Sequence, residues 1–365
     1  MRMIYTLLLL IISLVIPAQA SPIIGGAIQV KHVSGQTYQI EVQLLSDLSS
    51  KEVDTQDLLV CFGDGQTSNF SLTNSQPATD AEGLTLLTYT GTHTYVESGT
   101  YQIAVSSPPR SASLLNRSES KHKNVFLWTV INTQFPNSTP LSSPLVREAG
   151  LRQAYAVSLQ GTDLESDSLS YRLARTAIPS PGTCGVRMQA KQFTYPNDVE
   201  KEGVFYIDGS NQLNWTAPTR SGDFYYAIIA TEWRNGIKIS ESYQEAAVRV
   251  VEKPGDKIEI PAYQSAEVAM NRPSSNPDEA SAVKITIEAY PNPSDDQIKV
   301  IVSSQDALPV TIKVLNVNGQ ELEKVQKSAV HLSESSFSLK KHGSGLYLIK
   351  AVSAKGTAVK KVVIK

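Results

Sequence analysis

Alternation of apolar and polar residues recurs along much of the chain and predicts strands. Residues 38–44, 101–106 and 155–160 each place an apolar residue at every second position. A period of two puts alternate side chains on opposite faces of a strand, so that one face packs on a core and the other meets water. Residues 22–135 show no convincing 3.6-residue periodicity. The pattern therefore predicts an all-β chain of tandem antiparallel β-sandwiches.

The N-terminus departs from this alternation. Residues 1–3 are a short cationic start, residues 7–16 are almost entirely apolar, and small residues lead up to Ala20. These features predict a cleaved signal peptide over residues 1–20, with cleavage between Ala20 and Ser21. The apolar run is shorter than the roughly 20 residues that a membrane anchor needs. We expect no integral membrane segment once the signal is removed.

A second departure lies between residues 253 and 284. This stretch loses the strand rhythm and gains proline, serine and several carboxylates, which predicts a flexible linker. The remaining length suits domains of roughly 100–150 residues each. We predict a first sandwich over residues 21–138, a second over 139–252, the linker over 253–284 and a C-terminal sandwich over 285–365.

The C-terminal segment carries ordered landmarks, and an Asn-Gly pair within it predicts a hairpin turn. The landmarks are Tyr290, Pro291, Asn292, Pro293, Gly319, Gly345, Tyr347 and a lysine-rich end at residues 360–365. Their order resembles the type A C-terminal sorting domain of the type IX secretion system. The resemblance implies passage through the periplasm and export by the type IX machinery, giving a secreted or outer-surface protein. A third extracellular module, retained in the mature protein, is the alternative.

Two motifs in the first predicted sandwich resemble the PKD (polycystic kidney disease) repeat. They are Phe-Gly-Asp-Gly at residues 62–65 and His-Thr-Tyr at residues 93–95. The pair Asp64 and His93 invites a hydrolytic interpretation, but the chain has neither a G-x-S-x-G elbow nor an H-E-x-x-H motif. We favour a packing or cross-strand hydrogen-bonding role for His93.

The second predicted sandwich resembles cadherin-like and immunoglobulin-like bacterial surface modules through its residues 162–171 and 213–218. Trp215 is expected to anchor its core, because an indole buries about 150–250 Å². The order of motifs across both sandwiches resembles gliding-motility-associated surface proteins. That resemblance implies a string of adhesive modules and transfers no catalytic residue.

Three alternate carboxylates, Asp163, Glu165 and Asp167, lie in one short loop of the second sandwich. Carboxylate oxygens suit Ca²⁺, a hard cation, and the spacing would allow a site. Ser166 stands where such a loop is expected to have glycine, and turns of sandwiches are often acidic only because they are solvated. We favour the solvated turn over the calcium site, and expect no other cofactor.

Composition narrows the remaining possibilities. A net charge of −2 over 365 residues gives no reason to expect a nucleic-acid partner. The two cysteines, Cys61 and Cys184, fall in different predicted sandwiches. An oxidising compartment would permit a bridge, but we favour two separately buried thiols, since free cysteine often packs as a small hydrophobe.

These observations favour a non-enzymatic secreted or surface-attached protein with a role in adhesion or surface structure. Trp233, Arg234 and Tyr243 are candidate contacts for an extracellular glycan or protein ligand, although each could equally belong to the core. A glycan-binding accessory module is the first alternative. A secreted hydrolase with an unrecognised active site is the second, because paired carboxylates can be distant in sequence.

Overall fold

The computed structural model describes residues 23–47, 57–78, 83–109, 114–116, 124–140, 145–180, 182–190, 193–266, 285–354 and 356–365. Within them the chain forms strands and two short 3₁₀ helices, so the predicted all-β fold is confirmed. The predicted signal peptide and its cleavage site lie outside the described residues. Neither helix in the described part is long or apolar enough to cross a membrane.

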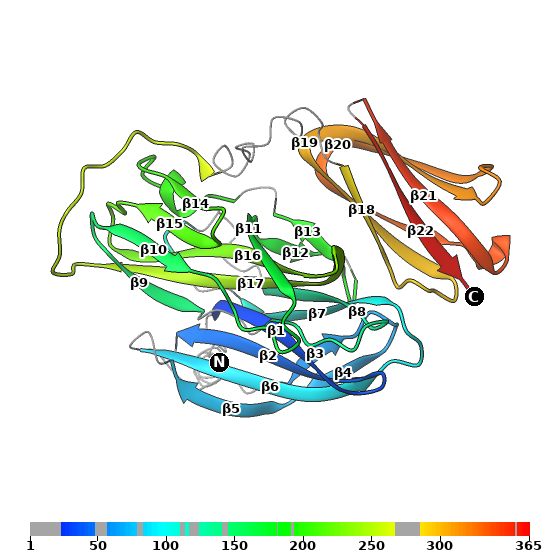
Figure 1. The fold of residues 1–365 in the computed structure, drawn as a ribbon, viewed down its shortest axis with the longest axis horizontal. Coiled ribbons are helices and arrows are strands. Elements are labelled where there is room, and N and C mark those ends of the chain that lie inside the picture. The colour runs from blue at the N-terminus through cyan, green and yellow to red at the C-terminus, as the bar shows by residue number, and fades with distance from the viewer. Residues whose placement is uncertain are drawn as a thin grey trace, which may run out of the picture.

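The first module is a pair of sheets packed face to face (Figure 1). One sheet has the order β4-β3-β7-β8 and the other β1-β2-β6-β5. The strands are β1 (Ile23–Ser34), β2 (Thr37–Asp47), β3 (Leu58–Cys61), β4 (Thr67–Phe70), β5 (Leu72–Pro77), β6 (Leu84–Thr94), β7 (Thr100–Pro109) and β8 (Asn124–Asn132). Apolar residues that alternate along β2 and β7, such as Ile40 and Ile103, meet in the core between the sheets.

The second module pairs a sheet of order β11-β16-β17-β9 with a smaller one of order β10-β15-β14. Its elements are β9 (Val146–Gly150), β10 (Ala154–Ser158), β11 (Ser168–Ala174), β12 (Ala177–Pro179), β13 (Arg187–Gln189), η1 (Pro196–Asp198), β14 (Phe205–Ile207), β15 (Gln212–Thr216), β16 (Gly222–Arg234) and β17 (Ile237–Val251). Trp215 is buried between the sheets and meets Phe205 and Phe224 edge-on. It is the core anchor that the sequence predicts.

Strand β17 joins the two modules. Along its whole length it pairs with β16, and its other edge is shared in succession by three strands. These are β8 at Ser240–Ser242, β1 at Gln244–Glu245 and β9, in parallel, at Ala247–Val251. Gly25 permits the approach of β1, because a Cβ there would lie 2.4 Å from the carbonyl oxygen of Glu245. The modules therefore share a continuous hydrogen-bonded sheet.

A disulfide adds a covalent link between the modules. Cys61, at the end of β3, bonds to Cys184 in the loop between β12 and β13, with 5.5 Å between the Cα atoms. The expectation of two separate thiols was therefore wrong. The cysteines are 123 residues apart in sequence, and only the packing of the β12–β13 hairpin against the first module brings them together.

The first part of the predicted linker is packed against the second module. Residues 253–266 run back along it, with backbone hydrogen bonds from Ile258 to Arg152 and from Gln264 to Gly203. Ala266 is fully buried in the core that surrounds Trp215. The rest of the predicted linker, residues 267–284, lies outside the described residues.

The C-terminal module is a five-stranded sheet folded around a core of its own (Figure 1). Its elements are β18 (Ile285–Tyr290), β19 (Gln297–Asn316), β20 (Glu321–Ser338), η3 (Lys340–His342), β21 (Gly345–Ser353) and β22 (Gly356–Ile364). The predicted Asn-Gly turn joins β19 to β20. Gly319 has a φ of +80° there, and the Asn316 carboxamide accepts hydrogen bonds from the backbone of Asn318 and Gln320.

Candidate functional site

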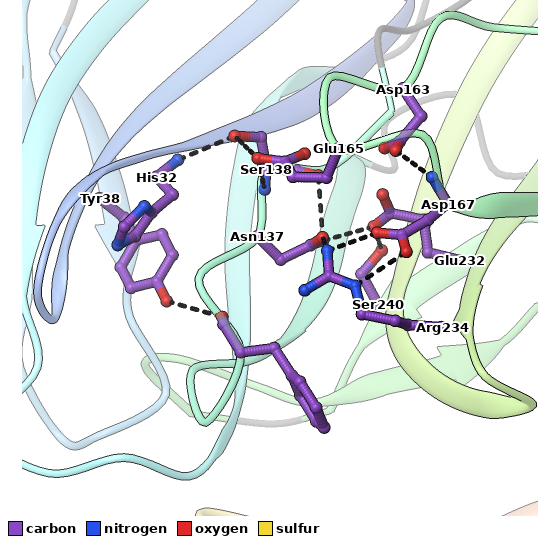
Figure 2. A network of polar contacts seen from close by, with 11 residues as sticks. His32, Tyr38, Asn137, Ser138, Asp163, Glu165, Asp167, Glu232, Arg234 and Ser240 are labelled. Atoms are coloured by element: carbon purple, nitrogen blue, oxygen red, sulfur yellow. Dashed lines mark hydrogen bonds and ion pairs between the residues drawn. The ribbon is translucent and has the colours of Figure 1, made fainter.

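A polar cluster lies where the segment between the two modules meets the second one (Figure 2). Three parts of the chain supply it: residues 137–138 after β8, the loop before β11, and the end of β16 with the facing part of β17. The residues are Asn137, Ser138, Asp163, Glu165, Asp167, Glu232, Arg234 and Ser240.

Three carboxylates converge at the centre of this cluster. Asp163, Asp167 and Glu232 each place one oxygen within 4.8 Å of the other two. The Asp163 Oδ1 accepts a hydrogen bond of 2.5 Å from the Asp167 backbone N–H. The Asp163 Oδ2 and the Glu232 Oε1 are both buried, and no N–H or hydroxyl group of a third described residue donates to either. We call these three residues the carboxylate cluster.

Arg234 balances part of this negative charge. Its Nε and Nη2 donate to the two oxygens of Asp167 at 2.8 and 2.6 Å, and Nη2 also donates to the Asn137 side-chain oxygen at 2.8 Å. The hydrogen bond to Asp167 raises the pKa of the Arg234 guanidinium, so this group stays charged. One fixed positive charge therefore faces three carboxyl groups.

Glu232 is the most deeply placed member of the carboxylate cluster. Its side chain is fully buried, and its Oε2 accepts hydrogen bonds from the Asn137 amide and from the Ser240 hydroxyl. Burial and the neighbouring Asp163 raise the pKa of Glu232 to about 9, although the bonds from Ser240 and Asn137 oppose the rise. Ionising the Glu232 carboxyl is therefore costly.

Glu165, which the sequence groups with the two aspartates, lies outside the carboxylate cluster. Its Oε1 accepts hydrogen bonds from the backbone N–H and hydroxyl of Ser138, at 3.2 and 3.0 Å. The third carboxylate of the cluster is that of Glu232. The sequence analysis does not single out this residue. The Asn-Gly hairpin signal at residues 235–236 places Glu232 near a turn, but no local pattern shows which loop packs beside that turn.

The three candidate ligand contacts have different surroundings. Tyr243 is buried, with its ring stacked on Trp128 and its hydroxyl bonded to Glu245, so it is a core residue. Arg234 is held by Asp167. Trp233 is 37 % exposed, and its indole N–H donates to the Ser170 hydroxyl at 2.9 Å. Trp233 alone among the three presents an accessible ring.

Asp64 and His93 form a structural pair in the first module. The His93 ring stacks on Phe62 with 3.9 Å between centroids, and its Nε2 lies 2.7 Å from the Asp64 Oδ2. Burial alone would raise the pKa of Asp64, but hydrogen bonds from His93 and the Gln66 backbone lower it below the usual value. His93 thus has the packing and hydrogen-bonding role that the sequence favours.

The landmarks of the C-terminal module hold its two ends together. The Asn292 carboxamide donates to the Lys361 carbonyl at 3.2 Å and accepts from the Val363 N–H at 2.9 Å. Ser294 exchanges backbone bonds with Val363 and Lys365, both of 2.9 Å. The opening motif and the lysine-rich end therefore complete each other's hydrogen bonds.

Tyr290 and Tyr347 are buried in two different cores. Tyr347 is buried in the module's own core, and its hydroxyl donates to the Gly343 carbonyl at 2.6 Å. Tyr290 packs instead in the core cluster that the first module shares with the β12–β13 hairpin, β16 and β17, as does Ile301. Burial raises the pKa of Tyr290 to about 12.

Polar contacts complete the docking of the C-terminal module. Glu288 forms ion pairs with Arg187 and Lys238. The Thr100 N–H donates to the Asn292 carbonyl at 3.0 Å, and Lys299 donates to the Cys184 carbonyl at 2.9 Å.

Comparison with known families decides what this module is. Residues 288–365 match the family model described as "Secretion system C-terminal sorting domain". The C-terminal module is a type IX sorting domain. Because it carries this sorting domain, the protein is secreted or displayed at the cell surface and interacts with the type IX secretion machinery, as the sequence predicts. We refer to residues 23–266 as the passenger.

No curated protein matches the chain. Among solved structures, it is similar to the BSP domain of a biofilm-associated protein, at 7 % identity and a TM-score of 0.19, covering 98 % of this chain and 69 % of that one. It is also similar to the four N-terminal Ig domains of Dscam1 isoform 8.4, at 7 % identity and a TM-score of 0.17, covering 93 % and 99 %. Scores this low carry no structural argument.

Proposed function

We propose that the protein is a non-enzymatic adhesive or structural component of the outer cell surface, whose passenger binds an extracellular glycan or protein. The observation that carries this proposal is the joining of a sorting domain to a passenger whose two modules share strand β17. Export brings the passenger to a surface, and a continuous sheet can transmit load between a ligand and the cell. The passenger's resemblance to PKD-like and cadherin-like modules supports the same role.

The tip of the β16–β17 hairpin is the proposed contact surface. It carries Trp233, whose ring is held by Ser170, and Ile237, which is 53 % exposed. A tight turn with positive φ at Asn235 and Gly236 fixes the hairpin. An exposed aromatic ring on a rigid element loses little entropy on binding, and such residues contribute strongly to protein interfaces.

Binding of the purified mature protein to arrays of immobilised glycans and extracellular proteins tests this proposal. Trp233→Ala should weaken binding to the selected ligand by about 30-fold, the loss expected for an aromatic hot spot worth about 2 kcal/mol. Tyr263→Ala is the matched control, because Tyr263 is similarly exposed, at 41 %, but lies on the segment after β17. Equal effects of both variants would contradict the hairpin site.

The nature of the array ligand separates the alternatives. Selective glycan binding would favour an accessory role beside a secreted hydrolase. Turnover of any array compound by the same protein would overturn the non-enzymatic proposal.

Export itself is tested in cells. Mass spectrometry of surface, medium and periplasmic fractions should find the product of the full chain outside the cell, without residues 290–365, and a chain truncated after Ala282 in the periplasm. Equal export of both chains would contradict a requirement for the sorting domain.

A further inference from the structure

We propose that Asp163, Asp167 and Glu232 form a calcium site that ties the loop before β11 to the end of β16. This inference differs from the ligand set of the sequence, which contains Glu165 and lacks Glu232. It concerns the passenger alone and does not depend on the proposed adhesive role. Figure 2 shows the three carboxylates and the groups around them.

The first support is the pair of buried oxygens without donors. The Asp163 Oδ2 and the fully buried Glu232 Oε1 lie in the same cluster, and within the described part of the chain no N–H or hydroxyl group of a third residue donates to either. A buried carboxylate oxygen without a donor or a cation is costly, so such groups are normally paired or coordinated. The remaining oxygens of these two residues are already used by Asp167, Asn137 and Ser240. These two oxygens are left to share either a proton or a cation.

The second support is the balance of charge. With all three carboxylates ionised around a cation, the cluster brings three negative charges, and Arg234 returns one positive charge through Asp167. The net charge of −2 that remains matches a divalent cation. Glu165 is engaged by Ser138, outside the cluster.

The chemistry of the donors favours calcium among the divalent cations. All three donors are carboxylate oxygens, which suit hard cations, and no histidine or cysteine belongs to the cluster. Calcium accepts six to eight oxygens in irregular geometry, whereas magnesium demands a near-ideal octahedron. The ligands come from a loop and a strand, and Asn137 bonds to both Glu232 and Arg234. A bound cation would therefore also fix the segment between the modules.

Calcium binding is tested on the mature protein after treatment with a chelator. Isothermal titration calorimetry should detect one site with a Kd of about 10⁻⁴–10⁻³ M, the range of extracellular modules. The unfolding temperature should rise with calcium concentration, and magnesium should have a smaller effect. No heat and no shift up to about 10 mM calcium, ten times the weakest affinity in that range, would overturn the proposal.

Matched variants locate the site. Glu232→Gln should weaken calcium binding by at least about 10-fold, the scale found even for outer-shell partners of a metal. Its amide can donate to the Asp163 Oδ2, so the variant should fold without calcium. Asp163→Asn is the second test, should Glu232→Gln not fold.

Glu165→Gln is the control and should leave the affinity within about 2-fold, because its carboxylate lies outside the cluster. Equal losses in Glu165→Gln and Glu232→Gln, or full affinity in both Glu232→Gln and Asp163→Asn, would overturn the assignment.

Discussion

The passenger has two modules joined by backbone and covalent bonds, whereas the sorting domain meets the passenger mainly through side chains. Between the modules, β17 pairs with strands of both, and the disulfide joins β3 to the β12–β13 hairpin. Between passenger and sorting domain, the described residues form a backbone hydrogen bond from Thr100 to Asn292, several ion pairs and a contact through the buried Tyr290. The two modules of the passenger should therefore unfold as one unit. The sorting domain should separate from the passenger more readily than the two modules separate from each other.

Removing the disulfide should have the largest effect on this comparison. The double variant Cys61→Ser with Cys184→Ser should lower the free energy of unfolding of the passenger by about 3–5 kcal/mol, because the bridge closes a long loop in the unfolded chain. Urea unfolding followed by tryptophan fluorescence measures this loss. A loss confined to the first module, with the Trp215 signal unchanged, would contradict a single cooperative unit.

Crowding the contact between β1 and β17 should have the next largest effect. Gly25→Ala places a methyl group 2.4 Å from the Glu245 carbonyl oxygen, which is backbone and cannot move aside freely. We expect a loss of about 1–3 kcal/mol in unfolding free energy. Gly209→Ala is the matched control, since a Cβ there meets no atom within 4 Å. Similar losses in both variants would show that the close approach of β1 to β17 does not contribute to the free energy of unfolding.

Acid should weaken the first module through Asp64. Because the pKa of Asp64 is lowered on folding, its stabilising contribution is complete above the ordinary carboxyl pKa of about 4 and is lost as pH falls through the lower folded value. Asp64→Asn should cost about 1.5–3 kcal/mol at pH 7, the scale of a hydrogen bond to a charged group. Thermal unfolding between pH 2 and 7 measures it, and the cost should shrink at the acid end. A constant cost would show that the loss does not depend on ionisation of Asp64.

Weakening the contact between the sorting domain and the passenger should have the smallest effect on the stability of the passenger. Glu288→Gln removes the carboxylate that pairs with Arg187 and Lys238, and should change passenger stability by less than about 1 kcal/mol. Small-angle scattering should show a more extended molecule. Glu321→Gln, which breaks an ion pair with Lys313 inside the sorting domain, is the control and should leave the shape unchanged. A large loss of passenger stability would show that the sorting domain belongs to the same cooperative unit.

Local patterns were sufficient for much of this fold. Alternation along residues 38–44 predicted the strand that packs Ile40 into the core, and the Asn-Gly pair predicted the turn at Gly319. The sorting domain was identifiable because its landmarks lie in one continuous segment. Trp215 was a predictable core residue, since a large aromatic ring on the apolar face of a strand is stabilised by burial.

The carboxylate cluster shows where such prediction stops. Asp163 and Asp167 are close in sequence and also lie together in the structure, but Glu165 between them faces Ser138 instead. Glu232 enters the cluster from a strand that pairs with β11 and was not grouped with them. A loop's backbone path decides which carboxylates point inward, and sequence spacing alone does not specify that path.

By itself the sequence determined the class of structure and the sorting domain, because alternation, turn residues and contiguous motifs are local properties of the chain. Only the tertiary structure decided that Cys61 meets Cys184, that β17 serves both modules and that Glu232 joins two aspartates. Each of these contacts depends on which strand edges pair across long stretches of chain. That choice minimises unpaired backbone groups and exposed apolar surface over the whole molecule, so no single segment encodes it.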